Sequence, residues 1–181
     1  MSLPTKAQSW HRNNFIISTD KTLLSIASIN SAFDAEFMYW TSSVPDSALE
    51  EIIRNSFCFG LYENARETDV TAGTGSKEEE EQREYKQIGF ARLITDCVTF
   101  AYLTDVYVLP EYQGRGLGGW LLDCVNELLE PLPHLRWTML RTSSRKSKES
   151  YERRMGMSIL AYRDVEDGPV MMGRKGKGNR V

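Results

Sequence analysis

The sequence is poor in the residues that form disulfides or bind structural metals. It contains three cysteines and two histidines in 181 residues. Cys58, Cys97 and Cys124 are odd in number, widely spaced and set in apolar runs. That pattern is typical of buried thiols in a reducing compartment, not of a disulfide framework. His11 and His134 lie far apart in the sequence, so we expect no zinc or other metal site.

Long apolar runs and an excess of charge of one sign are also missing. No segment approaches the roughly 20 apolar residues of a membrane span, and residues 1–10 lack the apolar core of a signal peptide. The net charge of −3 gives no general attraction to nucleic acid or membranes. We therefore predict a cytoplasmic protein that acts as a monomer or homodimer, with neither nucleic acid nor a membrane as partner. Its length fits a single domain over residues 1–181.

The most informative stretch is residues 105–122. A β-branched and aromatic run stops at Pro110, a polar turn rich in glycine follows, and apolar residues then recur at helical spacing. This order predicts a strand, a glycine turn and an amphipathic helix. The first amides of a helix have no partner inside it, and the helix dipole adds about half a positive charge there. We expect an anion such as phosphate at this turn, where Arg115 adds a permanent charge.

The motif Gln113-Gly-Arg-Gly-Leu-Gly, preceded by Val-x-Val-x-Pro-Glu-Tyr, resembles the acetyl-CoA signature of the GCN5-related N-acetyltransferase (GNAT) family. The resemblance implies an α/β (α+β) fold. Its central mixed, mostly antiparallel sheet would have six to seven strands, flanked by about four helices and splayed at the cofactor site. It also implies acetyl-CoA as cofactor. The backbone of Val106, Tyr107 and Val108 would then hold the pantetheine and thioester, and the pyrophosphate would lie on Gln113, Gly114, Arg115, Gly116, Leu117 and Gly118.

A dinucleotide-binding turn is the rival interpretation, because Gly114, Gly116 and Gly119 also satisfy Gly-x-Gly-x-x-Gly between a strand and a helix. That fingerprint expects an acidic residue about 20 positions further on. The chain has Arg136 to Arg141 there, and an Arg could suit a 2′-phosphate. Too little chain follows, however, to complete a doubly wound sheet.

The remaining elements follow from periodicity and turn residues. A helix capped at Thr19-Asp20 is expected to run through Phe33, and others over 45–53 and 146–155, the last one ended by Gly156. Residues 63–84 form an acidic insertion that we expect to be flexible, and residues 174–181 a basic, disordered tail. Strands are predicted at 14–18, 56–62, 86–95, 98–108, 135–140, 157–162 and 168–172. The third and fourth strands form an antiparallel hairpin, and the fifth runs parallel to the fourth.

Candidate catalytic residues follow from the resemblance and from strand periodicity. Tyr151 resembles the family's tyrosine on the last helix, a general acid for the leaving thiolate. The base is left open between Tyr102, which stands where relatives often have a Glu, and the nearest carboxylates, Asp105 and Glu111. Simple alternation along the strand predicts that Tyr102, Thr104, Val106 and Val108 share one face, with Asp105 and Tyr107 on the other.

Candidate contacts to the acceptor lie elsewhere in the chain. Tyr39 and Trp40 belong to an aromatic run between the first two predicted helices, a region that closes over the acceptor in the resembled family. Arg92 lies inside a strand, where it faces either the acceptor or solvent. We predict an acetyl-CoA-dependent N-acetyltransferase that acts on a primary amine, with a small-molecule acceptor favoured over a protein or peptide amine. A non-catalytic acyl-CoA sensor is the alternative.

Overall fold

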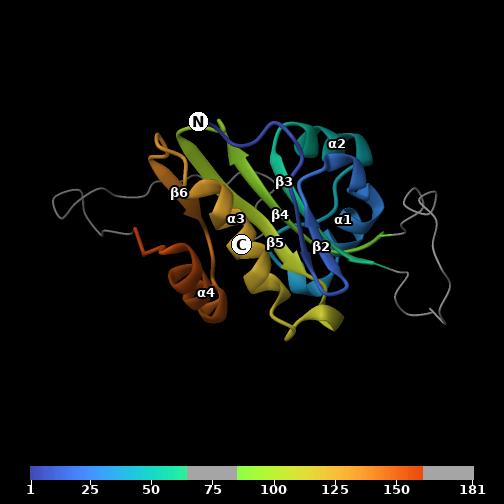
Figure 1. The fold of residues 1–181 in the computed structure, drawn as a ribbon. Helices are drawn as coiled ribbons and strands as arrows, with labels where there is room; N and C mark the ends of the chain where they lie inside the picture. The colour runs from blue at the N-terminus through green and yellow to red at the C-terminus, as the bar shows by residue number, and fades with distance from the viewer. Residues whose placement is uncertain (65–84, 161–181) are drawn as a thin grey trace, which may run out of the picture.

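The computed structural model describes residues 1–64 and 85–160, and these form one open sheet with helices on both faces (Figure 1). Neighbouring strands in the sheet are also consecutive in the sequence, and all pairs are antiparallel except β5 and β6, which are parallel. The strands are β1 (Ser9–Arg12), β2 (Phe15–Ser18), β3 (Phe57–Asn64), β4 (Tyr85–Thr95), β5 (Phe100–Val108) and β6 (Trp137–Leu140). The helices are α1 (Ile26–Phe33), α2 (Asp46–Arg54), α3 (Leu117–Leu129) and α4 (Arg145–Met155). The mixed, mostly antiparallel sheet of six strands and the four helices confirm the predicted fold class.

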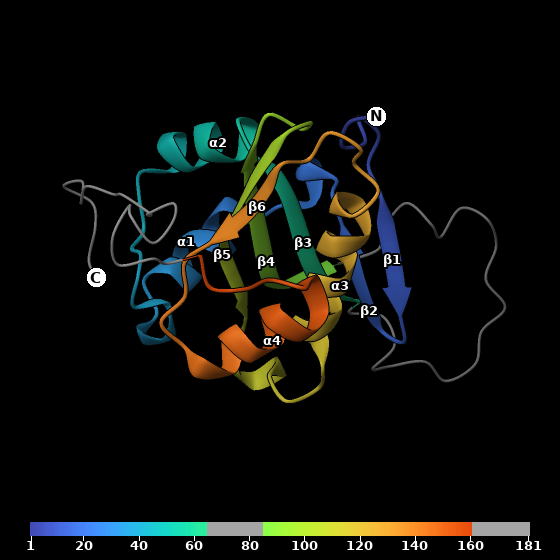
Figure 2. The same ribbon diagram turned by 90° about the vertical axis from the view of Figure 1, so that its left-hand side faces the viewer.

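Two apolar clusters, one on each face of the sheet, hold the helices in place. The first lies under α3, whose buried face contributes Leu117, Leu121 and Val125. The second lies under α1 and α2 and joins Ile29 and Leu49 to the sheet. Figure 1 shows α1 and α2 together at one side of the molecule and α4 at the other, below β6, while Figure 2 shows α4 beside α3. One face of the sheet is therefore covered by α3 and the opposite face by α1 and α2.

The predicted hairpin and crossover are both confirmed. β4 and β5 pair antiparallel across a tight turn in which Asp96 accepts hydrogen bonds from the backbone N–H groups of Val98, Thr99 and Phe100. The chain then crosses through α3 and returns as β6 parallel to β5. This excludes the doubly wound sheet of the dinucleotide-binding alternative, since only one strand pair among the described residues is parallel.

Two predicted elements were wrong in their bounds, and one strand was missed. The first helix is divided into a short 3-10 turn over Lys21–Leu23 and α1, because Asp20 and Ser25 cap them separately. The Ser25 N–H also donates to the buried Gln87 side chain on β4, which fixes the break. Strand β3 continues through Asn64, past the predicted start of the insertion at residue 63. β1, which precedes the first predicted strand, was not expected at all.

The C-terminal prediction was wrong for residues 157–160. They leave α4 without forming a strand, and Ile159 is 70% exposed, so no strand in the described part of the chain packs against this apolar run. The rest of that predicted strand, the strand at 168–172, the tail at 174–181 and the insertion over 65–84 lie outside the described residues. Within residues 1–64 and 85–160, no helix is both long and apolar enough to cross a membrane, and no cluster of potential metal ligands occurs.

Candidate functional site

The sheet opens along one side of β5. β6 accompanies β5 only from Phe100 to Leu103, after which the chain leaves β6 toward α4. Among the described residues, no strand pairs with that side of β5 from Thr104 to Val108. Backbone N–H and C=O groups on such an edge seek other hydrogen-bonding partners. The edge is therefore a place where an extended ligand could bind by main-chain hydrogen bonds.

An extra residue in β5 coincides with this opening. Phe90 pairs with Tyr107 but Arg92 pairs with Thr104, so two steps along β4 match three along β5. Asp105 takes up the extra length with φ of +53°, in the left-handed region. This is a β-bulge, which bends a strand and re-aims its side chains.

The bulge overturns part of the predicted alternation. Tyr102 and Thr104 lie on the face of α1 and α2 because their partners, Ile94 and Arg92, alternate with residues packed beneath α3. Val106 and Val108 instead pack toward α3. The prediction that all four share one face is thus wrong, and the one inserted residue is the reason. Asp105 and Tyr107 do share a face, as expected. Burial raises the pKa of the Tyr107 phenol, and the nearby charge of Asp105 raises it further.

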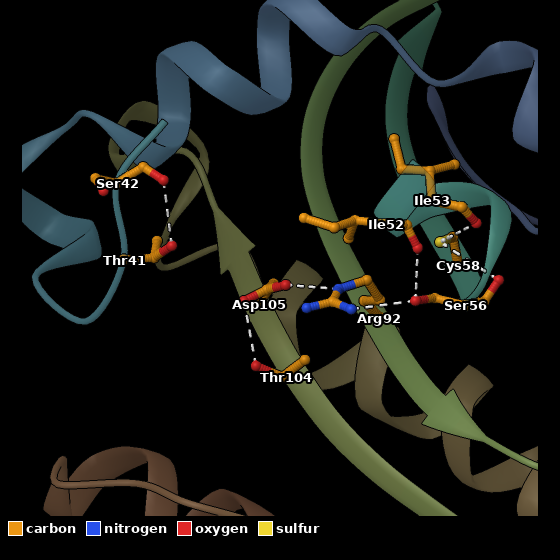
Figure 3. A network of polar contacts seen from close by, with 9 residues as sticks. All are labelled: Thr41, Ser42, Ile52, Ile53, Ser56, Cys58, Arg92, Thr104 and Asp105. Carbon is orange, nitrogen blue, oxygen red and sulfur yellow. Dashed lines mark hydrogen bonds and ion pairs between the residues drawn. The ribbon is translucent and has the colours of Figure 1, made fainter. Parts of the chain in front are cut away.

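Arg92 and Asp105 form a buried ion pair across β4 and β5. Arg92 Nε donates to Asp105 Oδ2 at 2.7 Å, and their side chains are 14% and 9% exposed. Arg92 Nη1 donates to Ser56 Oγ at 3.1 Å, and the Thr104 hydroxyl donates to Asp105 Oδ1 at 3.1 Å (Figure 3). The solvent-facing alternative for Arg92 is therefore wrong. Both oxygens of Asp105, a candidate base, already accept a hydrogen bond.

The glycine turn begins at the end of β5. Gln113 Nε2 donates to the Val108 carbonyl at 2.9 Å and closes the turn. Gly114 and Gly116 have φ of +81° and +75°, a conformation that glycine adopts without the steric cost of a Cβ. Gly116 is the N-cap of α3 and has no side chain to satisfy the helix amides. In the part of the chain that the structure describes, no backbone N–H from residue 114 to residue 119 donates a hydrogen bond.

Two arginines bring positive charge to these free amides. Arg115 lies in the turn itself and over the Tyr112 ring, 5.2 Å from its centroid. Arg12, at the end of β1, donates from Nη1 to the Gly116 carbonyl at 3.4 Å and lies 5.9 Å from the Trp120 ring centroid. No ion pair among the described residues includes Arg12. Arg12 could not be predicted as part of this site, because its contact with the turn spans 104 positions and β1 was not expected.

Tyr151 lies on α4 and is half-buried against the apolar cluster that Val106, Val108 and α3 share. Burial raises the pKa of its phenol above the ordinary value, which keeps the hydroxyl protonated near neutral pH. Within residues 1–64 and 85–160, that hydroxyl makes no hydrogen bond. A protonated phenol with an unengaged O–H is a suitable proton donor.

Tyr39 and Trp40 lie on the connection between α1 and α2. Tyr39 is 50% exposed and hydrogen-bonds Ser143, which follows β6, so this bond joins two segments 104 positions apart. Trp40 is half-buried against the cluster under α1 and α2, with its ring 4.9 Å from that of Tyr39. The Asn30 side chain bonds the backbone at Val44 and the Asp46 carboxylate, which ties the end of the connection to α1. The two aromatics are therefore held beside the chain that leaves β6.

The other candidates are placed apart from these groups. Tyr102 is half-buried on the face of β5 that α1 and α2 cover, two residues before Thr104. Glu111 is exposed in the 3-10 turn Pro110–Tyr112. Cys58 and Cys124 are buried and Cys97 is partly so; burial raises the pKa of Cys58 to about 11 and that of Cys124 to about 12. Cys58 and Cys124 are therefore not thiolate nucleophiles at neutral pH.

Comparison with known proteins gives a consistent assignment. The family model described as "Acetyltransferase (GNAT) domain" matches residues 78–156. A protein of Gibberella zeae named as an acetyltransferase is 45% identical over 141 residues, which cover 78% of each chain. The crystal structure of a GNAT-family protein from Xanthomonas campestris is 30% identical, with a TM-score of 0.63 over 91% of this chain and 94% of that one.

A further solved structure, a GNAT acetyltransferase from Elizabethkingia anophelis with acetyl-CoA bound, is 12% identical and has the same fold, with a TM-score of 0.50. The matched region covers 83% of this chain and 80% of the Elizabethkingia anophelis chain. The open edge of β5, the glycine turn and the sheet order thus agree with the sequence relationship, and the chain belongs to the GNAT family of acetyltransferases.

Proposed function

We propose that this acetyltransferase uses acetyl-CoA and transfers the acetyl group to a primary amine of a small molecule, by direct attack within a ternary complex. The observation that carries the proposal is the run of free amides from residue 114 to residue 119, directly beyond the unpaired edge of β5. A molecule that is extended at one end and anionic at the other matches this arrangement. Acetyl-CoA has both features, and it is bound to the Elizabethkingia anophelis relative.

The residues present fit such a ligand. Free N–H groups at the start of α3, together with Arg115 and Arg12, favour the pyrophosphate through hydrogen bonds and charge. The open backbone of Val106, Tyr107 and Val108 would hold the pantetheine arm, and an N–H on this edge would stabilise the oxyanion that develops on the thioester carbonyl. Bound there, acetyl-CoA supplies the activated acetyl group.

The protein's own residues would manage the protons. The amine attacks the thioester carbon, so that a C–N bond forms while the C–S bond breaks. Tyr151 would donate its phenolic proton to the departing sulfur, a role that its unengaged hydroxyl and its place beside Val106 and Val108 support. The amine proton would leave to water, since the carboxylate of Asp105 is already bonded to Arg92 and Thr104 and the phenol of Tyr102 has no charge with which to accept it. Much of the rate then comes from holding the two reactants together.

The acceptor would approach from the side of the sheet that carries Tyr39 and Trp40. The hydrogen bond from Tyr39 to Ser143 spans the gap between the α1–α2 connection and the chain that leaves β6. An acceptor there would contact a few side chains on two short segments, a scale of contact that favours a small amine over a folded protein.

Thermal unfolding with acetyl-CoA, CoA, NADP or no ligand tests the donor. A ligand that binds only the folded state at a hundredfold excess over Kd stabilises it by about 2.7 kcal/mol. Acetyl-CoA and CoA should raise Tm and NADP should not; a shift with NADP alone would refute the donor assignment. An acceptor screen with detection of the released thiol then tests the substrate class, and turnover on peptides alone would contradict a small-molecule acceptor.

Replacing Tyr151 with Phe tests the acid. The phenyl ring preserves the packing against the cluster under α3, so we expect unchanged acetyl-CoA affinity and a kcat about 100-fold lower, the lower end for loss of a general acid. An unchanged kcat would remove Tyr151 from this role. A wild-type protein that binds acetyl-CoA but acetylates no amine would instead favour an acyl-CoA sensor.

A further inference from the structure

The polar network between β4 and β5 has no part in the chemistry just described, although it is buried beside it. Removing two charges from water is costly unless each finds a partner, so a buried pair calls for an explanation beyond stability. Here the pair joins the strand that carries the bulge to its neighbour. Its carboxylate belongs to the bulged residue, Asp105.

From this coincidence the structure assigns Arg92 and Asp105 a positioning role. The pair holds the left-handed backbone at Asp105, so that the open edge from Val106 to Val108 is aimed at the acetyl donor. Asp105 then acts through its backbone conformation and not as the catalytic base. The inference rests on the proposed use of acetyl-CoA and adds which residues shape the donor site.

The hydrogen bonds show how the conformation is held. Arg92 is fixed at its other end by Ser56, whose hydroxyl in turn donates to the Ile52 carbonyl at 2.7 Å (Figure 3). The guanidinium is therefore anchored to the end of α2, on an element outside the bulge. From there Nε reaches Asp105 Oδ2, while Thr104 binds the other oxygen. A side chain bonded on both oxygens cannot rotate away without leaving Arg92 buried and unpaired.

The register shows what the conformation achieves. From Phe100 to Leu103, β5 pairs with both β4 and β6; after the bulge, only the β4 side is paired among the described residues. The inserted residue turns Val106 and Val108 toward α3 and the glycine turn. Without it, the same strand would present the opposite set of side chains to that face, because a shift of one residue exchanges the two faces. The donor site therefore depends on Asp105 keeping a positive φ.

Residue replacements at 105 separate conformation from basicity. Asn and Gly both accept the left-handed region, whereas Ala does not, and none of the three is a base. Asp105→Asn keeps a side-chain oxygen for Arg92. The double variants Arg92→Met with Asp105→Gly, and Arg92→Met with Asp105→Ala, remove both charges and differ from each other by one methyl group at position 105.

Acetyl-CoA affinity by calorimetry is the first measurement, with wild type alongside and Tm as a check of folding. We expect Asp105→Asn and the Gly double variant to bind within about threefold of wild type, and the Ala double variant to bind about tenfold more weakly, the equivalent of one left-handed non-glycine residue. Equal affinity of the Gly and Ala double variants would overturn the inference. If wild type itself fails to bind acetyl-CoA, the proposed function and the inference both fail.

The pH dependence of kcat/KM, with the best amine from the acceptor screen, is the second measurement. Asp105→Asn should keep the wild-type profile and most of the rate, which a role in positioning predicts and a catalytic base does not. A loss of 100-fold or more in kcat with normal acetyl-CoA affinity, about the contribution of a general base, would show that Asp105 moves a proton and would overturn the inference while leaving the proposed function intact. Asp105→Asn removes the charge that compensates the buried Arg92, so we expect its Tm to fall, and its affinity and rate are compared with wild type well below that Tm. It then remains informative if the double variants do not fold.

Discussion

Replacing Gly116 and Gly118 separately with Ala should distinguish two uses of glycine in the turn. Gly116 has φ of +75°, and an added Cβ would meet only the Arg12 guanidinium nitrogens at 3.5 and 3.7 Å, an ordinary contact distance. The cost of Ala at this position is therefore one of backbone conformation, about 1–2 kcal/mol. For a chain of this length, each kcal/mol changes Tm by about 2–4 °C. Gly116→Ala should thus lower the Tm of the unliganded protein by about 2–8 °C.

Gly118 lies in the first turn of α3 with an ordinary helical conformation. An added Cβ would lie 3.7 Å from the Val108 Cγ2 atom, which requires no shift of neighbouring atoms. Ala is about 1 kcal/mol more favourable than Gly inside a helix. The unliganded Tm of Gly118→Ala should therefore equal that of wild type or exceed it by up to about 4 °C.

The effect on ligand binding should run the other way. The Gly118 Cβ would lie beside the free amides of residues 114–119, where a pyrophosphate needs close approach. At an acetyl-CoA concentration that stabilises wild type by about 2.7 kcal/mol, Gly118→Ala should lose at least half of the Tm shift. Differential scanning fluorimetry with and without acetyl-CoA measures both quantities. An unliganded Tm of Gly116→Ala equal to that of wild type would refute the conformational argument, and a full acetyl-CoA shift of Gly118→Ala would refute the argument from close approach.

Three further predictions concern single contacts. Arg12→Met should weaken acetyl-CoA binding about tenfold, the size of one charge-assisted hydrogen bond. The affinity for an S-acetyl donor without phosphates should not change, and Arg54→Met on α2 is the matched control. Equal losses of affinity with both donors would contradict the phosphate contact. Tyr39→Phe loses the bond to Ser143 but keeps the ring on Trp40, so the KM of the amine should change and that of acetyl-CoA should not, as steady-state kinetics would show. Asp96 has a lowered pKa because of the hydrogen bond from Thr99 and those from the backbone, so its stabilisation is complete above the unfolded value of 3.8 and is lost as pH falls toward the lower folded value. The Tm difference between wild type and Asp96→Asn should therefore be largest above pH 4 and shrink below it; a constant difference would contradict this.

The elements that were predicted correctly carry their signals locally. β5, the glycine turn and α3 follow from a β-branched run, positions that need positive φ and a period that changes from two to 3.6 residues. The left-handed cap at Gly156 ends α4 as expected, with φ of +62°. In each case a few neighbouring residues determine the outcome. No distant contact was needed to predict it.

The features that could not be predicted depend on pairing between distant segments. The bulge at Asp105 exists only relative to the register of β4, and alternation along β5 alone assumes that no residue is inserted. Ser9–Arg12 has little strand character, but its pairing with β2 makes it β1 and brings Arg12 to Gly116. The ion pair of Arg92 likewise joins residues that only the hairpin brings together. Sequence reasoning therefore predicted the strand and the glycine turn of the proposed donor site and missed the distant contacts around them.

The proposed donor and acceptor sides differ in the atoms that form them. If both proposals hold, this difference determines which substitutions could change the substrate. On the donor side the groups in question are mainly backbone amides of β5 and of residues 114–119, which are set by conformation at Asp105, Gly114 and Gly116. Most side chains there can change without altering those amides. On the acceptor side the contacts are side chains on separate segments, joined through Tyr39 and Ser143. Substitutions at those two segments should therefore alter which amine is acetylated while acetyl-CoA binding is preserved.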